Sequence, residues 1–165
     1  MSTDTENISI LGLAESILEK TKDITKYLQA NNFVAPTFSS VAGNLPRTAD
    51  YQKLQSDLRT SLEDLQRLVE GPEKFYRHFL MRGYELAAFQ IALDFDFFAL
   101  VPTKGDISLE ELASKAGLDK DRTSRVMRLL ITHRFFQECK PGFISHNSFS
   151  VALQDEEFKS VVHYS

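Results

Sequence analysis

The chain has 165 residues, of which 42% are hydrophobic, and a formal net charge of −4. This acidic balance argues against a protein that binds nucleic acid by bulk electrostatics. The single cysteine, Cys139, excludes an internal disulfide, and no apolar stretch approaches the roughly 20 residues of a membrane span. Because the acidic N-terminus does not resemble a secretory signal either, we expect a cytoplasmic protein.

Residues 1–71 are predicted to form an N-terminal helical segment. Apolar residues recur at helical spacing from Ile10 to Leu28, and the pair Asn31-Asn32 ends this pattern. Residues 33–47 show no period and contain two prolines, which indicates an extended loop. A second helix follows this loop. Gly71-Pro72 ends the second helix and places a proline in the first turn of a third helix. The apolar stripe of the second helix consists of Leu54, Leu58, Leu62, Leu65 and Val69.

The next helix, over residues 73–98, is apolar on more than one side. Such a helix is buried either in the core of one chain or in an interface between subunits, and its pattern leaves both possibilities open. The residues concerned are Phe75, Phe79, Leu80, Leu86, Phe89, Ile91, Leu93, Phe95, Phe97 and Phe98.

Residues 72–154 are predicted to form a winged helix-turn-helix domain. Ser108-Leu-Glu-Glu111 fits a capping box for a short helix that ends at Gly117, and Asp119 caps a longer helix over residues 120–134. Strands at 135–140 and 143–146 flank the turn residues Pro141-Gly142. The expected fold is therefore mainly α, with a small β-hairpin. Residues 155–165 are predicted to begin a further helix.

The sequence contains no glycine-rich nucleotide loop and no paired Cys/His metal motif. We therefore expect no cofactor-binding and no metal-binding residue within it. A winged helix raises the possibility of DNA binding, and Arg122, Arg125 and Arg128 lie along the potential recognition helix. The overall acidity opposes this hypothesis, and solvation or salt bridges to another domain explain the arginines at least as well.

His133 is the candidate site residue. It follows Val126 by seven positions and Leu129 by four, which predicts a place on the inward face of its helix. Two interpretations remain open. A histidine at a helix C-terminus is favoured by the helix dipole and bonds to a nearby carbonyl, whereas a functional histidine projects into a pocket that another domain closes.

The stretch from Arg125 to Ser150 strongly resembles fungal class I O-methyltransferases. The resemblance covers about residues 10–165, and its specific part lies between Ser108 and Ser150. That family carries an R-x-x-R helix, an F-x-E strand, a P-G turn and an H-T-x-x-S sequence. Here Arg125–Arg128, Phe136-Gln-Glu138, Pro141-Gly142 and His146-Asn-Ser-Phe-Ser150 stand in those places, with Asn147 where threonine is usual.

The resemblance implies that residues 1–71 interlock two subunits of a homodimer and that the winged helix covers a small-molecule substrate. It also implies that S-adenosyl-L-methionine is bound by a C-terminal Rossmann-type domain outside this chain, which the 155–165 helix would lead to. This fragment alone would not be an enzyme.

His133 stands where many family members have asparagine. Within the family the sequence is most similar to the O-methyltransferase-like pericyclases, the group of the leporin-pathway dehydratase and Diels–Alderase. That resemblance implies stereoselective dehydration of a polyketide- or pyridone-type alcohol followed by cyclisation, with His133 donating a hydrogen bond to a substrate oxygen as a catalytic residue. The alternatives are a true O-methyltransferase, a DNA-binding winged helix and a dimerisation module without chemistry.

Overall fold

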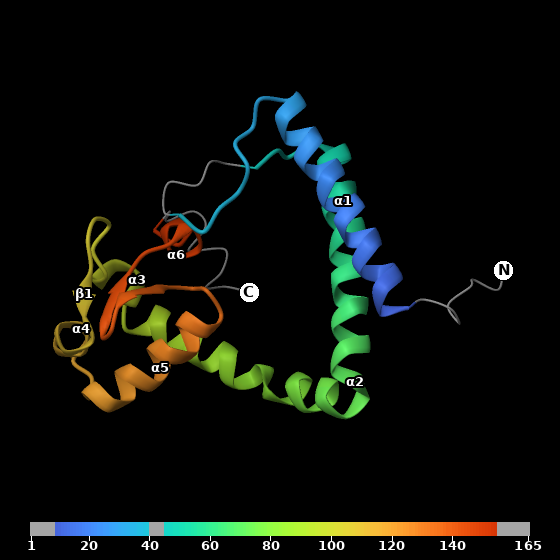
Figure 1. Ribbon diagram of the computed structural model, residues 1–165. Coiled ribbons are helices and arrows are strands. Elements are labelled where there is room, and N and C mark those ends of the chain that lie inside the picture. Colours follow the sequence, from blue (N-terminus) through green and yellow to red (C-terminus); the bar gives the residue numbers. More distant parts are fainter. Residues whose placement is uncertain (1–8, 40–44, 155–165) are drawn as a thin grey trace. The chain divides into compact units, whose positions relative to one another are not determined.

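A computed structural model describes residues 9–39 and 45–154 of the chain (Figure 1). These residues form two compact units. The first comprises residues up to 36 together with 45–80, and the second comprises residues 37–39 and 81–154. Among the described helices, none has the length and apolar character that a membrane crossing requires. The helix predicted over 155–165 lies outside the described residues.

The first unit is a pair of antiparallel helices, α1 (Ile10–Ala30) and the first half of α2 (Ala49–Asp94), which lie side by side in Figure 1. The Ser9 hydroxyl caps α1, and Asn31 ends it as the sequence predicts. Near the connecting loop, the Tyr27 and Thr48 hydroxyls lie 2.6 Å apart and the Tyr27 and Tyr51 rings 5.6 Å apart. These contacts fix the register of the two helices, because Tyr51 is buried between them.

The break predicted at Gly71-Pro72 is a kink inside α2. Gly71 has φ 70° and ψ 166°, a backbone conformation that glycine adopts far more readily than other residues. Two contacts bridge the kink. His78 Nδ1 lies 3.2 Å from Glu70 Oε1, and the Arg67 guanidinium lies over the Phe75 ring at 5.8 Å.

Beyond the kink, the middle of α2 is exposed in the single chain. Full burial begins only at Ala88, so the core of a single chain does not cover this stretch. The possibility that an interface covers it is unaffected. The exposed large apolar residues of this stretch are Tyr76, Phe79, Leu80, Met81, Tyr84 and Leu86.

The second unit is a winged helix, which confirms the predicted fold class. After α3 (Phe97–Leu100), strand β1 (Ile107–Ser108) leads into α4 (Leu109–Ala116) and α5 (Lys120–Thr132). Strands β2 (Gln137–Lys140) and β3 (Phe143–Ser145) form the wing, and α6 (Ser148–Ala152) follows. The sheet is antiparallel with the order β1-β3-β2, so the predicted hairpin has gained a third, two-residue strand.

The turns of this unit follow the sequence signals closely. Gly117 ends α4 with φ 67°, Asp119 caps α5, and Gly142 has φ 76° in the wing turn. Only half of the predicted capping box at α4 is made: the Ser108 hydroxyl accepts the Glu111 N–H, while the Glu111 carboxylate pairs with Lys115 at 2.8 Å.

The core of the second unit is built from aromatic rings. The Phe98 and Phe136 rings stack at 4.8 Å, and the Phe89 and Phe135 rings lie 4.9 Å apart. Helix α5 turns Met127 and Leu130 into this core, whereas Val126 and Leu129 are half-buried beside it. The inward face of α5 is therefore rotated slightly from the one that the spacing predicts.

Candidate functional site

His133 lies at the C-terminal end of α5, where it is the capping residue rather than a member of the helix. It is exposed, so its predicted place on the inward face is wrong: α5 ends at Thr132 and the chain turns away. The imidazole Nε2 lies 3.3 Å from Oε1 of Glu85, on the C-terminal part of α2. Its partner is thus a carboxylate rather than the backbone carbonyl expected of an ordinary helix-end histidine.

The backbone next to His133 is held in an unusual conformation. Arg134 has φ 61°, in the left-handed region that non-glycine residues rarely adopt. The Asn147 side-chain amide donates a hydrogen bond of 2.8 Å to the Arg134 carbonyl, and the Arg134 guanidinium lies 5.4 Å from the centre of the Phe38 ring. These contacts stabilise the turn that carries His133 away from the core.

Asn147 is almost fully buried, at 1% exposure, and has a second task. Its side-chain oxygen accepts the N–H groups of Phe149 at 2.9 Å and Ser150 at 3.1 Å, which caps α6. The residue that departs from the family's usual threonine therefore joins the start of α6 to the end of α5. A threonine has one short hydroxyl in place of the amide, so it cannot make all these bonds together.

The other described histidines lie elsewhere. His146 is buried and donates from Nε2 to the Val101 carbonyl at 3.0 Å, while its Nδ1 is buried without a hydrogen-bond partner among the described residues. Burial lowers the pKa of His146, although the bond to the Val101 carbonyl opposes this shift. His78 belongs to the kink of α2, and His163 lies outside the described residues.

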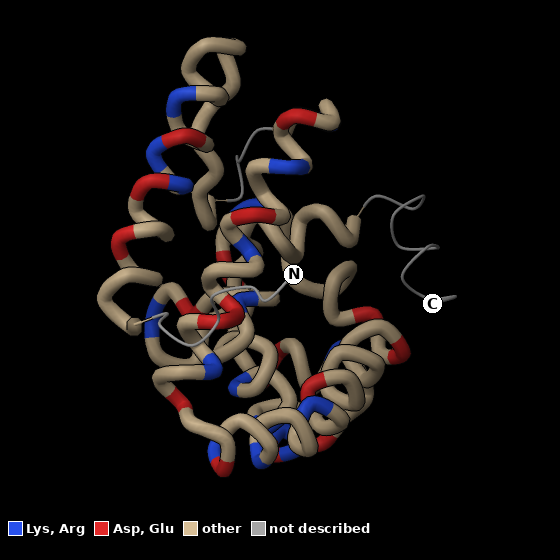
Figure 2. The backbone as a smooth tube through the Cα atoms, turned by 90° about the vertical axis from the view of Figure 1, so that its right-hand side faces the viewer, with Lys and Arg blue, Asp and Glu red and all other residues tan. Residues whose placement is uncertain are grey.

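The basic residues of the winged helix are mixed with acids. Arg125 pairs with Asp121 at 2.6 Å and Lys120 with Glu110 at 3.0 Å. Figure 2 shows Lys and Arg interspersed with Asp and Glu along the helices. Such mixing does not produce the basic face that phosphate backbones require.

The described sheet differs from the sheet of a Rossmann-type cofactor site. A Rossmann-type site lies where parallel strands end in a glycine-rich turn, whereas the described sheet is short and antiparallel. Its single turn glycine, Gly142, belongs to a hairpin.

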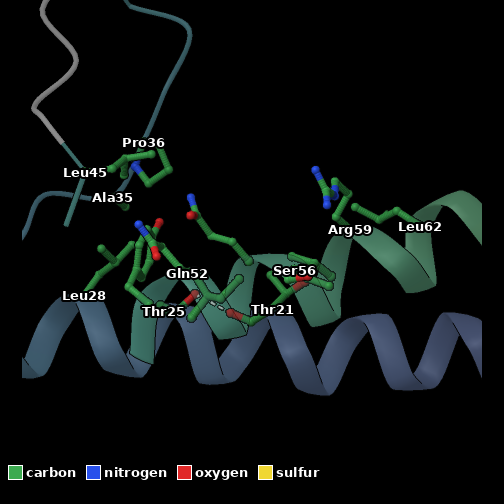
Figure 3. Close-up of a pocket in the computed structure, with 14 residues that line it drawn as sticks. Thr21, Thr25, Leu28, Ala35, Pro36, Leu45, Gln52, Ser56, Arg59 and Leu62 are labelled. Atoms are coloured by element: carbon green, nitrogen blue, oxygen red, sulfur yellow. Dashed lines mark hydrogen bonds between the residues drawn. The ribbon is translucent and has the colours of Figure 1, made fainter. Parts of the chain in front are cut away.

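The first unit contains an open hollow of about 800 Å³ (Figure 3). It lies along α1 and the start of α2, and Ala35, Pro36 and Leu45 of the loop border one end. Its lining is mostly apolar and contains no acidic residue, so it offers a surface for packing rather than a catalytic centre. The lining residues are Thr21, Ile24, Thr25, Leu28, Ala35, Pro36, Leu45, Tyr51, Gln52, Gln55, Ser56, Leu58, Arg59 and Leu62.

The chain is similar to known proteins along most of its length. No protein-family model matches the chain. The chain is 45% identical over 157 residues to the O-methyltransferase sol2 of Alternaria solani, an alignment that covers 94% of this chain and 37% of that protein. This chain is a relative of the N-terminal part of the fungal O-methyltransferases. It spans little more than a third of the length of these curated relatives.

Two solved structures share the fold. One is OxaC, crystallised in complex with SAH and oxaline, with a TM-score of 0.62 at 16% identity over 89% of this chain and 34% of OxaC. The other is LepI in complex with SAM, with a TM-score of 0.62 at 18% identity over 92% of this chain and 34% of LepI. At these identities the likeness to OxaC and to LepI establishes the fold alone.

Two features of the site were not found by sequence reasoning. Glu85 lies 48 positions before His133, and no periodicity or motif joins the two. The bond from Asn147 to the Arg134 carbonyl was also missed, although a signal existed, because Asn147 departs from the family motif.

Proposed function

We propose that this chain is the N-terminal, dimerising and substrate-covering part of an S-adenosylmethionine-dependent O-methyltransferase of fungal secondary metabolism. The observation that carries the proposal is the 45% identity to O-methyltransferase sol2 along nearly the whole chain. This favours the methyltransferase alternative over the pericyclase that His133 suggested from sequence. The cofactor is assigned to a domain outside this chain.

The dimerisation role rests on apolar surface that one chain leaves uncovered. Six large apolar residues of α2 between positions 76 and 86 are each more than half exposed, with Leu80 at 78%. Soluble monomers seldom display so many together, and a second copy of the same chain covers such a surface symmetrically. The apolar hollow beside α1 adds to the surface available for packing.

The substrate-covering role is assigned to the end of α5. His133 presents an exposed imidazole there, 3.3 Å from Glu85. The next residue, Arg134, lies over the half-exposed Phe38 ring, which in turn contacts the half-exposed Phe149 ring. Exposed aromatic rings and an exposed imidazole in the same unit suit a flat, hydroxylated small molecule, because rings contact its faces and a ring nitrogen binds its oxygen.

A pericyclase remains the second candidate. Its support is the resemblance that His133 suggests to the pericyclases, together with the fold shared with a solved pericyclic reaction enzyme, at a TM-score of 0.62 and 17% identity. The two functions differ in the fate of the cofactor, since a methyltransferase consumes S-adenosylmethionine and a pericyclase only retains it.

The test is to incubate the full-length protein with S-adenosylmethionine and a panel of phenolic and enolic metabolites. We expect S-adenosylhomocysteine and a product heavier by one methylene unit, both detected by mass spectrometry. A protein that binds S-adenosylmethionine, converts a substrate and never forms S-adenosylhomocysteine would establish the pericyclase instead.

The dimer is tested on the 165-residue chain by sedimentation equilibrium at tens of micromolar. We expect a mass of twice 18.8 kDa for the wild type and a shift toward monomer for Leu80→Glu, which introduces charge into the proposed interface. Lys104→Glu, in an exposed loop of the winged helix, should leave the mass unchanged. A wild-type chain that sediments as a monomer contradicts the dimer.

A further inference from the structure

We infer that Glu85 is a positioning residue, which fixes the ring of His133 so that Nδ1 is the nitrogen offered to the substrate. The inference rests on the role proposed above for His133. Its structural basis is the contact of 3.3 Å between His133 Nε2 and Glu85 Oε1.

The contact joins two elements that are distant in sequence. Glu85 belongs to the part of α2 that enters the second unit, three residues before the buried Ala88, and His133 caps α5. Both side chains are about one-third exposed, at 38% for Glu85 and 34% for His133. The pair is therefore anchored on packed helices but remains open to a small molecule.

A carboxylate accepts protons and donates none, so at 3.3 Å the charge of Glu85 favours the ring form of His133 that carries its proton on Nε2. In the neutral ring, Nδ1 then bears the lone pair and accepts a hydrogen bond from a substrate hydroxyl. The carboxylate also fixes the ring plane, as carboxylates do for metal-binding and catalytic histidines in other proteins.

The backbone beneath the ring is fixed independently. The left-handed conformation of Arg134 directs the chain away from α5, and the buried Asn147 amide holds the Arg134 carbonyl at 2.8 Å. With the main chain held by Asn147 and the ring held by Glu85, His133 retains little freedom. An exposed histidine without these contacts would sample several rotamers, at a cost to any directed hydrogen bond.

The first test measures the ring directly in the 165-residue chain by NMR, at a pH of about 8, where an ordinary imidazole is neutral. In the wild type we expect the His133 ring nitrogens to report one tautomer, with the proton on Nε2. In Glu85→Ala the two nitrogen shifts should move toward each other, because the released ring becomes a mixture of tautomers. Glu85→Gln, whose amide oxygen still accepts, should restore most of the wild-type pattern.

Glu73→Ala is the matched control, since Glu73 is an exposed carboxylate on the same helix that pairs with Arg77. It should leave the His133 shifts unchanged. Identical ring-nitrogen shifts in the wild type and Glu85→Ala would overturn the inference.

The second test is a double-mutant cycle on turnover in the full-length protein. His133→Ala should lower turnover by about 10²-fold or more, and Glu85→Ala by roughly 10-fold, because the imidazole remains in place without its orienting partner. In the His133→Ala background, Glu85→Ala should have no further effect. Equal effects of Glu85→Ala in both backgrounds would overturn the inference.

The two proposals fail in different ways. If the wild type never forms S-adenosylhomocysteine, methyl transfer is contradicted, and the NMR measurement still decides whether Glu85 fixes His133. If methyl transfer occurs but the ring shifts ignore Glu85, only the positioning role is lost.

Discussion

Asn147→Ala offers the sharpest test of how the winged helix holds the turn that bears His133. The substitution removes the cap of α6, a change that costs about 0.5–2 kcal/mol at typical helix N-termini. It also removes the 2.8 Å bond to the Arg134 carbonyl, which contributes about 0.5–1.5 kcal/mol net. The expected loss in the free energy of unfolding is therefore about 1–3.5 kcal/mol.

The assay is urea unfolding of the 165-residue chain, followed by circular dichroism at equilibrium. Asn147→Thr separates the two contributions, because a threonine hydroxyl can cap α6 but cannot also reach the Arg134 carbonyl. We expect it to lose about 1 kcal/mol, less than the alanine variant. Ser9→Ala is the control, since it removes an N-cap bond at the exposed start of α1, and should cost no more than about 1 kcal/mol.

One result would refute this reasoning. If Asn147→Ala cost no more than Ser9→Ala, the bond to Arg134 would contribute nothing, and the turn would be held by the Arg134–Phe38 contact and by packing alone.

Two further predictions concern the same unit. Burial lowers the pKa of His146 in the folded chain. As the pH falls below about 6.5, this imidazole is therefore protonated in the unfolded chain while it is still neutral in the folded chain. The free energy of unfolding should therefore fall as the pH drops from about 7 to about 5. Urea titrations should show a shallower fall for His146→Gln, and the same pH dependence in the variant and the wild type would show that His146 is not responsible. Gly117→Ala should lower the free energy of unfolding by about 1–2 kcal/mol, because φ is 67° there, whereas Gly83→Ala, inside α2, should not destabilise the chain.

The elements of the winged helix were set by local signals in the sequence. The turns at Gly117 and Gly142 depend on the positive φ that glycine adopts readily, and the start of α5 depends on the side-chain cap of Asp119. Neither feature requires contacts with residues that are distant in sequence. The kink at Gly71 has the same local origin. These positions were therefore predictable, as was the fold class that they define.

Burial was decided by tertiary structure. The apolar pattern of residues 73–98 indicates a helix that must be covered, but it cannot state whether the cover comes from the same chain, and one chain leaves Leu80 and its neighbours exposed. The rotation of α5, which places Met127 in the core and Val126 beside it, depends on how the Phe136 and Phe98 rings fill the space.

The candidate site shows the same division. The sequence by itself singled out His133 and the unusual Asn147. The partners of these residues, Glu85 and the Arg134 carbonyl, come from segments 48 and 13 positions away. Only the tertiary structure of the second unit brings such groups within hydrogen-bond distance, because a side-chain contact depends on geometry that no local pattern encodes.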